Sequence, residues 1–203
     1  HFLRLSPFTT MEGEAAIGLH FFMLAATWSL PLFIHDLWAL ARERQLAPVV
    51  WVSDAAKFAP GKSIRGGAPV CWPWFGAHDS ESGYPAHGFA RTVPWQVTGS
   101  RKRNDARTEI TLQLVDNEQT RTQWPHPTRL TLTVVVGDKL EMRLATSNTG
   151  AAPVKIGEAL HTYLHISDIG AVSVVGLEGC DYHDKVEDFA RKAQRGDITF
   201  GGE

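Results

Sequence analysis

The residues whose types suit acid–base or anion-binding chemistry fall in three short segments. The first, Ser63–Gly76, reads SIRGGAPVCWPWFG and places two glycines directly after Arg65. Glycine lets the backbone approach a ligand closely, and the planar guanidinium group of arginine offers donors that fit hydroxyls, carboxylates or phosphate. The aromatic residues that follow could wall a ligand site. A bulged strand with a surface arginine and core aromatic residues explains the same pattern.

The second segment, Pro85–Arg91, reads PAHGFAR. In a loop, the imidazole of His87 and the guanidinium of Arg91, four residues further on, could converge on one ligand. A structural histidine is the commoner explanation of a His-Gly pair, so this segment does not define a site by itself.

The third segment, Glu158–Ile166, reads EALHTYLHI and lies inside a strand-like run. Alternate side chains of a strand face opposite ways, so His161, Tyr163 and His165 would share one face. Such a face could be half a metal site, or it could hold an acid–base pair that lines a sugar cleft. Neither an HExxH nor a CxxC spacing is present to support zinc.

Strands are the elements expected to position these segments, because short β-branched runs bounded by turn residues recur from Pro48 onward. In Thr108–Val115, the residues Ile110, Leu112 and Leu114 share one face, and this period of two indicates a half-buried strand. The predicted strands are Val49–Ser53, Trp95–Gly99, Glu109–Val115, Arg129–Val136, Lys139–Thr146, Val154–Ile166 and Val172–Val175.

Turn residues separate these runs. The pair Gly137-Asp138 predicts a tight hairpin, and Asn148–Gly150 and Asp168–Gly170 predict further turns. After residue 50, a helical period is found only in Asp184–Lys192. Strands at this spacing without alternating helices indicate an all-β fold, an antiparallel sandwich or barrel.

Composition excludes several classes of protein. The 203 residues suit one domain, and 43% hydrophobic with 21% charged residues is ordinary for a globular chain. Twenty Lys+Arg against twenty-two Asp+Glu leave no basic bias toward nucleic acid. Two cysteines, Cys71 and Cys180, cannot form a disulfide framework, so we expect a reducing, cytoplasmic location.

The amino end differs from the rest. Ile17–Ile34 is an eighteen-residue apolar run, which is the threshold length for a membrane-spanning helix. His20, Pro31 and the acidic residues just upstream argue against a span, and the run lacks the flanks of a secretory signal. We expect a buried or misplaced segment here, with a membrane anchor or signal as the alternative.

Taken together and in this order, IRGGAPVCWPWFG, AHGFAR and ALHTYLHISDI resemble the glucose-6-phosphate 1-epimerase family, the hexose-6-phosphate mutarotases of the aldose 1-epimerase superfamily. The resemblance runs from about Val49 to the last residue and includes GLEG and the closing ITFGGE. It implies a galactose mutarotase-like antiparallel β-supersandwich with a sugar cleft on a concave sheet. We therefore expect residues 1–46 to be an atypical segment and residues 47–203 to be a partial mutarotase-like domain.

The resemblance also implies roles for single residues. His161 would be the general acid that protonates the ring oxygen O5, and His87 would hydrogen-bond the sugar near O5. Arg65 and Arg91 would bind sugar hydroxyls or the 6-phosphate. Position 86 is glutamine in some relatives and contacts ligand there, a contact that Ala86 cannot make.

The same resemblance implies the partners. The expected partner is a small-molecule hexose 6-phosphate, whose anomers would be interconverted without a metal or organic cofactor, since proton transfer suffices. No nucleic acid and no membrane are expected as partners, and the chain is expected to be a monomer.

In this family a ligand-binding aspartate and the catalytic base, a glutamate, follow the ITF strand. The sequence stops at Glu203, before either, and neither Glu203 nor Glu158 occupies the matching place. We therefore expect an inactive fragment. The alternatives are a non-catalytic carbohydrate-binding or regulatory module on the same scaffold, and a membrane-tethered structural domain anchored by Ile17–Ile34.

Overall fold

The structure, a computed structural model, describes residues 50–57, 59, 61–105, 107–137 and 139–201. The chain divides into two compact units, one that ends at Leu164 and one that runs from His165 to Glu203. Each unit is described by itself below. The apolar run Ile17–Ile34 and the expected domain boundary after residue 46 lie outside the described residues.

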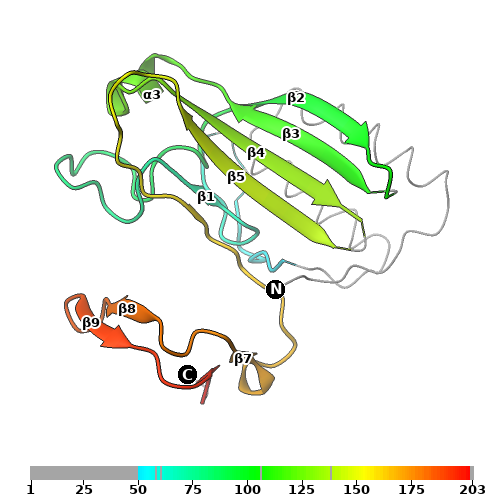
Figure 1. The fold of residues 1–203 in the computed structure, drawn as a ribbon, viewed down its shortest axis with the longest axis vertical. Helices are drawn as coiled ribbons and strands as arrows, with labels where there is room; N and C mark the ends of the chain where they lie inside the picture. The colour runs from blue at the N-terminus through cyan, green and yellow to red at the C-terminus, as the bar shows by residue number, and fades with distance from the viewer. Residues whose placement is uncertain (1–49, 58, 60, 106, 138, 202–203) are drawn as a thin grey trace. The chain divides into compact units, whose positions relative to one another are not determined.

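A four-stranded antiparallel sheet dominates the first unit (Figure 1). Its strands stand in the order β2-β3-β4-β5, with consecutive strands paired. Their bounds are Trp95–Lys102 for β2, Thr108–Leu114 for β3, Thr128–Val136 for β4 and Leu140–Asn148 for β5. Val136 pairs with Leu140, so the predicted hairpin around Gly137 is confirmed. The antiparallel, all-β expectation is confirmed as well.

One face of this sheet is apolar, as the period of two predicts. Leu132 is fully buried, and its pairing with Leu112 and Leu144 sets the register across three strands. The buried residues of β3 and β4 on this face are Ile110, Leu112, Leu114, Leu130, Leu132 and Val134. Apolar burial of this kind is the main force that fixes the register of a half-buried strand.

The core packs this face against the segment that carries Trp72 and Phe89. These two rings meet edge to face, with centroids 5.6 Å apart. The buried indole N–H of Trp72 donates to Oγ1 of Thr146 at 3.0 Å, and the Thr146 hydroxyl donates to Glu158 at 2.9 Å. The indole is thus satisfied, as a buried donor must be, and β5 is linked to the segment that precedes His161.

The predicted strand Val154–Ile166 is wrong in its extent. Only β6, Ala159–Leu160, forms a ladder, with β1, Val70–Cys71. The backbone N–H of Thr162 bonds back to the carbonyl of Leu160 at 2.9 Å, and this two-residue closure is a γ-turn centred on His161 that interrupts the strand.

The predicted strand Val49–Ser53 is also reduced. Its described part makes two single bridges, Val50 with Leu164 and Val52 with Gly66. Trp51 lies between them and donates its backbone N–H to the carbonyl of Tyr163 at 2.9 Å. The segment therefore still borders the region of His161, although it is not a regular strand.

A short helix, α3, Glu118–Gln123, was not predicted. Asn117 caps it: the side chain of Asn117 accepts from the backbone N–H of Thr120 at 3.0 Å, and the Thr120 hydroxyl accepts from that of Asn117 at 2.9 Å. This reciprocal pair is a capping box, which stabilises a helix start by satisfying orphan donors.

The second unit contains two short antiparallel pairs and a 3₁₀ turn, η1, Ile169–Ala171. The strands β7, Ser173–Val174, and β10, Ile198–Thr199, form one pair. The strands β8, Asp181–Asp184, and β9, Ala190–Ala193, form the other.

The helical period expected in Asp184–Lys192 is wrong, because this stretch is the turn of the β8–β9 hairpin. Asp188 and Phe189 have φ values of 51° and 61°, which no right-handed helix allows. Lys192 bonds to both Asp184, at 2.8 Å, and Glu187. The opposite charges of this stretch therefore pair across the hairpin and do not stabilise a helix.

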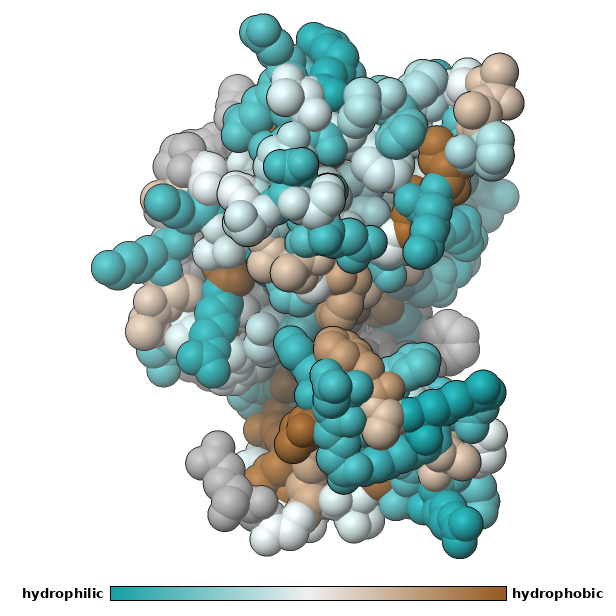
Figure 2. Space-filling view, turned by 90° about the vertical axis from the view of Figure 1, so that its left-hand side faces the viewer, coloured by the Kyte–Doolittle hydropathy of each residue, from teal (hydrophilic) through white to brown (hydrophobic). Residues whose placement is uncertain are grey.

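Both cysteines are free, Cys71 buried and Cys180 exposed. No helix among the described residues has the length and hydropathy to cross a bilayer. Figure 2 shows hydrophobic side chains, in brown, reaching the surface among hydrophilic ones. Two of the exposed large hydrophobic residues of the first unit are Trp51 and Phe75.

Candidate active site

His87 is held in an unusual backbone conformation by its neighbours. Its φ is 64°, in the left-handed region, and it is followed by Gly88 at 70°. The backbone N–H of His87 donates to the carbonyl of Gly76 at 2.6 Å, while the N–H of Gly76 donates to Nδ1 of the His87 ring at 3.1 Å. Hydrogen bonds to Gly76 therefore hold both the backbone and the imidazole ring of His87.

The tight turn after His87 requires glycine. A Cβ on Gly88 would lie 1.9 Å from the carbonyl oxygen of Trp72. That oxygen accepts from the N–H groups of Phe89 and Ala90 at 3.1 and 3.3 Å, which brings the histidine loop against the core strand segment. The His-Gly pair in the sequence thus has a structural cause in this close approach.

His161 reaches the same place from β6. Its backbone N–H donates to the carbonyl of Pro69 at 2.9 Å, beside the β1–β6 ladder. The two imidazole rings have centroids 6.2 Å apart and planes inclined at 70°. The structure therefore brings together the two histidines that the sequence singled out, from segments more than seventy residues apart.

Aromatic rings surround the two imidazoles. Phe75, 53% exposed, lies 4.7 Å from the ring of His87 and stacks at 6.3 Å and 18° on that of His161. Tyr163 lies 5.1 Å from His161, on the face that strand alternation predicts, and 5.9 Å from Trp51. We call Trp51, Phe75, His87, His161 and Tyr163 the aromatic cluster.

Arg91 is linked to the loop of His87. Its guanidinium donates to the carbonyl of Ala86 at 2.7 Å, one residue before the histidine. Burial raises the pKa of the Cys71 thiol, and the positive charge of Arg91 opposes that shift.

Arg65 approaches the aromatic cluster through its backbone. Its carbonyl accepts from Ser53 at 2.9 Å, and the adjacent Gly66, at φ 131°, packs so tightly that a Cβ would lie 2.5 Å from the Trp51 carbonyl oxygen. The side chain of Arg65 is exposed. The structure thus links Arg91 to the loop of His87, and Arg65 to Trp51. That Arg65, Arg91 and the two histidines line one shared hollow is our proposal.

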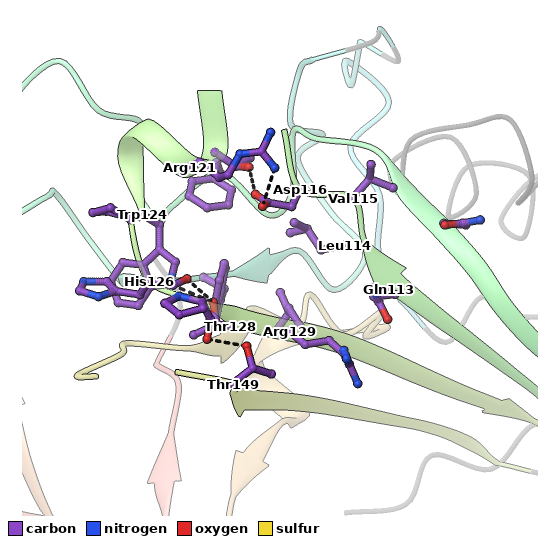
Figure 3. A pocket seen from close by; sticks show the side chains of 17 residues that line it. Gln113, Leu114, Val115, Asp116, Arg121, Trp124, His126, Thr128, Arg129 and Thr149 are labelled. Carbon is purple, nitrogen blue, oxygen red and sulfur yellow. Dashed lines mark hydrogen bonds and ion pairs between the residues drawn. The ribbon is translucent and has the colours of Figure 1, made fainter. Parts of the chain in front are cut away.

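A separate cavity of about 710 Å³ lies where α3 meets the start of β4 (Figure 3). None of the four predicted site residues lines it. Its Arg121 pairs with Asp116 at 3.2 Å, and its Trp124 donates to Thr128 at 3.0 Å. The cavity offers one imidazole, that of His126, which packs 4.4 Å from Trp124. The aromatic cluster instead brings two imidazoles together beside exposed aromatic rings, so it is the better candidate for acid–base chemistry on a ligand.

Metal ligation finds no support in the described ranges of the chain. No group of three or more His, Cys, Asp or Glu side chains lies close enough there to hold a metal ion. His165, which was expected to share a strand face with His161 and Tyr163, lies in the second unit.

Sequence reasoning missed the part played by Gly76, because a hydrogen bond from its backbone leaves no mark on residue type. It named Phe75 only as one of several flat apolar faces. The run of aromatic residues that ends at Phe75 and the His-Gly pair at 87–88 were the available signals.

The antiparallel β architecture, together with its similarity to solved structures, identifies a galactose mutarotase-like fold, and a family model specifies the family. Residues 34–200 match the family described as Aldose 1-epimerase, and the chain belongs to this family.

Relatives and solved structures agree with this assignment. The chain is similar to the "Putative glucose-6-phosphate 1-epimerase" of Escherichia coli (strain K12), at 40% identity over 151 residues, which cover 74% of this chain and 48% of the relative. A protein of the same name from Cenchrus ciliaris is 35% identical, with 76% and 49% covered. The crystal structure of "a putative mutarotase (YeaD)" from Salmonella typhimurium superposes with a TM-score of 0.67 at 36% identity, over 75% of this chain and 50% of that one. The chain spans about half the length of the curated relatives it matches.

Proposed function

We propose that this chain binds a hexose 6-phosphate and takes part in the interconversion of its α and β anomers. The observation that carries the proposal is the pair of imidazoles, His87 and His161, 6.2 Å apart within an exposed aromatic cluster. Family membership and the printed names of the relatives support this reaction class and this substrate.

In the proposed mechanism His161 is the general acid. It donates a proton to the ring oxygen O5 while a base removes the proton of the C1 hydroxyl, and the C1–O5 bond breaks to give the open-chain aldehyde. Rotation about C1–C2 and reversal of both proton transfers close the ring on the other face. Histidine suits this role because imidazole exchanges protons near neutral pH. The reaction consumes nothing and needs no cofactor.

By the family resemblance, the base is a glutamate beyond the residues of this sequence. Loss of a general base costs about 10²–10⁴-fold in rate, so a variant without this glutamate should interconvert anomers slowly. A purely carbohydrate-binding module on the same scaffold is the second candidate, since the exposed rings of Trp51 and Phe75 can contact a sugar without any proton transfer.

We propose the guanidinium of Arg91 as the main contact to the 6-phosphate. Arginine binds phosphate oxygens through paired, charge-assisted hydrogen bonds. The bond from Arg91 to the carbonyl of Ala86 uses only part of its five donors and holds the side chain beside the loop of His87. Arg65, whose neighbour Gly66 packs against Trp51 of the aromatic cluster, is proposed to bind sugar hydroxyls or the phosphate.

The first test measures binding by calorimetric titration with glucose 6-phosphate and with glucose. Arg91→Gln should weaken binding of the phosphorylated sugar more than that of the free sugar, and Arg91→Lys, which keeps the charge, should lose less. If Arg91→Gln weakens both sugars equally, the arginine acts only through the loop and the phosphate assignment is wrong.

The second test measures anomer exchange of glucose 6-phosphate by NMR. His161→Ala should abolish any exchange above the spontaneous rate, whereas His126→Ala, a matched change at the separate cavity, should leave it unaltered. Loss in His126→Ala but not in His161→Ala would move the site to the cavity. Binding without any exchange, in a chain extended to the length of the relatives, would favour the carbohydrate-binding module.

A further inference from the structure

The two nitrogens of the His87 ring lie in different surroundings. The backbone N–H of Gly76 points at Nδ1, 3.1 Å away, and the carbonyl of the same glycine accepts the His87 N–H at 2.6 Å. These reciprocal bonds fix both the backbone and the ring of His87 to a single residue.

A neutral imidazole carries its proton on one nitrogen, and the other nitrogen can only accept. Because Nδ1 of His87 accepts from a backbone N–H, which cannot reverse its role, the proton of the neutral ring lies on Nε2. A main-chain donor, the N–H of Gly76, thus selects the tautomer.

The backbone around this contact is held away from its preferred conformation. Gly76, His87 and Gly88 have φ values of 85°, 64° and 70°. For histidine a positive φ is unfavourable, and such strain is typical of positions that the surrounding structure holds for a function. The edge-to-face contact of Phe75 with the ring, at 4.7 Å, supports the same orientation.

We propose that Gly76 is a positioning residue that fixes the neutral His87 ring as the Nε2–H tautomer, so that the sugar contact implied for His87 by the family resemblance is made by a hydrogen-bond donor. The donor role rests on the proposed function, whereas the tautomer does not.

The tautomer is measured on the ¹⁵N-labelled full chain by long-range ¹H–¹⁵N correlation NMR at about pH 8, where ordinary histidines are neutral. His87 is assigned by the signals that vanish in His87→Asn. The spectrum contains its own references: Nδ1 of His78 accepts from the N–H groups of Ser80 and Glu81, and Nδ1 of His183 lies 3.1 Å from the carbonyl of Phe189.

His78 should therefore show the Nε2–H form and His183 the Nδ1–H form, because a carbonyl can only accept. We expect His87 to match His78. A His87 signal that matches His183, or one averaged between the two forms, would overturn the proposal.

The donor role is tested by binding of glucose 6-phosphate to two variants of His87. The amide oxygen of Asn can replace Nδ1 and keep the bond to Gly76, and Asn tolerates a positive φ, but it lacks a donor at the place of Nε2. The amide nitrogen of Gln can reach that place. We expect His87→Asn to weaken binding by about 3- to 10-fold, the range for one neutral hydrogen bond, and His87→Gln to weaken it less.

Equal binding by wild type and His87→Asn would overturn the donor role. A wild-type chain that shows the Nε2–H form but binds no glucose 6-phosphate would overturn the proposed function and the donor role together, while the tautomer set by Gly76 would stand. The spectrum can thus refute the tautomer, and the titration can refute the donor role, independently of each other.

Discussion

Replacing Gly88 by alanine should destabilise the chain far more than the same change at a glycine of equal backbone conformation. Gly88 and Gly61 both have φ of 70°. A Cβ at Gly61 would meet nothing within 4 Å, whereas at Gly88 it would lie 1.9 Å from the carbonyl oxygen of Trp72 and 2.8 Å from the nitrogen of Pro73. The pair separates backbone strain from steric clash.

The structure gives the magnitude of each part. A non-glycine residue in the left-handed region costs about 1–2 kcal/mol, and this applies to both positions. At Gly88 the new Cβ and the Trp72 oxygen must also move from 1.9 Å to more than 3.0 Å apart. That oxygen accepts two backbone hydrogen bonds, from Phe89 and Ala90, whose loss costs about 2 kcal/mol. We expect Gly88→Ala to cost about 3–4 kcal/mol and Gly61→Ala about 1–2 kcal/mol.

The assay is urea unfolding followed by tryptophan fluorescence, with the free energy of unfolding extrapolated to water. Trp72 reports on the site of the clash, since it is 3% exposed and its own carbonyl oxygen is the atom that must move. Equal losses of stability in Gly88→Ala and Gly61→Ala would refute the reasoning. A loss at Gly88 of less than about 1 kcal/mol would do so as well, because strain alone should reach that value.

Three further predictions concern other parts of the chain. Asn117→Ala removes the cap of α3, which receives the Thr120 N–H at 3.0 Å, and should cost about 1 kcal/mol in urea unfolding; no loss would mean that the cap is dispensable. Phe75→Ala should weaken glucose 6-phosphate binding in calorimetry and change stability by under about 0.5 kcal/mol, since the ring is 53% exposed; a large loss of stability would contradict this. The hydrogen bond from Lys192 lowers the pKa of Asp184, so this pair stabilises the fold above the unfolded pKa of the carboxyl and ceases to do so as pH falls through its lower folded value. Lys192→Met should raise the pKa of Asp184 in a ¹³C NMR titration, and an unchanged pKa would show that the backbone bonds alone lower it.

The centre of the sheet β2–β5 could be predicted from sequence because β3 and β4 each bury one face. Leu130, Leu132 and Val134 alternate with polar residues, and a shift of register by one residue would expose all three. The hairpin around Gly137 follows from the same pattern. In this part of the chain, local sequence and tertiary burial favour the same structure.

Prediction failed where tertiary contacts override the local pattern. The γ-turn at His161 ends a run that reads as one long strand, and no residue type marks it. Asp184–Lys192 was expected to show a helical period, but its charges Asp184, Glu187 and Lys192 pair across a hairpin. The helix α3 could have been found from Asn117 and the threonine three residues later, which form its capping box.

The candidate site was only partly accessible to sequence reasoning. His87 and His161 were found because residue type carries their chemistry. Their ring separation, the stacking of Phe75 on His161 and the bond from Gly76 depend on how distant segments pack, which spacing along the chain does not encode.

The weak attachment of His161 has a consequence for any preparation of this protein. The strand just before it, β6, is two residues long, whereas β4 and β5 pair over nine positions. Segments with few backbone bonds open without global unfolding, so the amides around His161 should exchange with deuterium well before those of β4. A sample can therefore retain its full β-type circular dichroism after the imidazole has left its place, and spectroscopic integrity of the sheet is no guarantee of an assembled site.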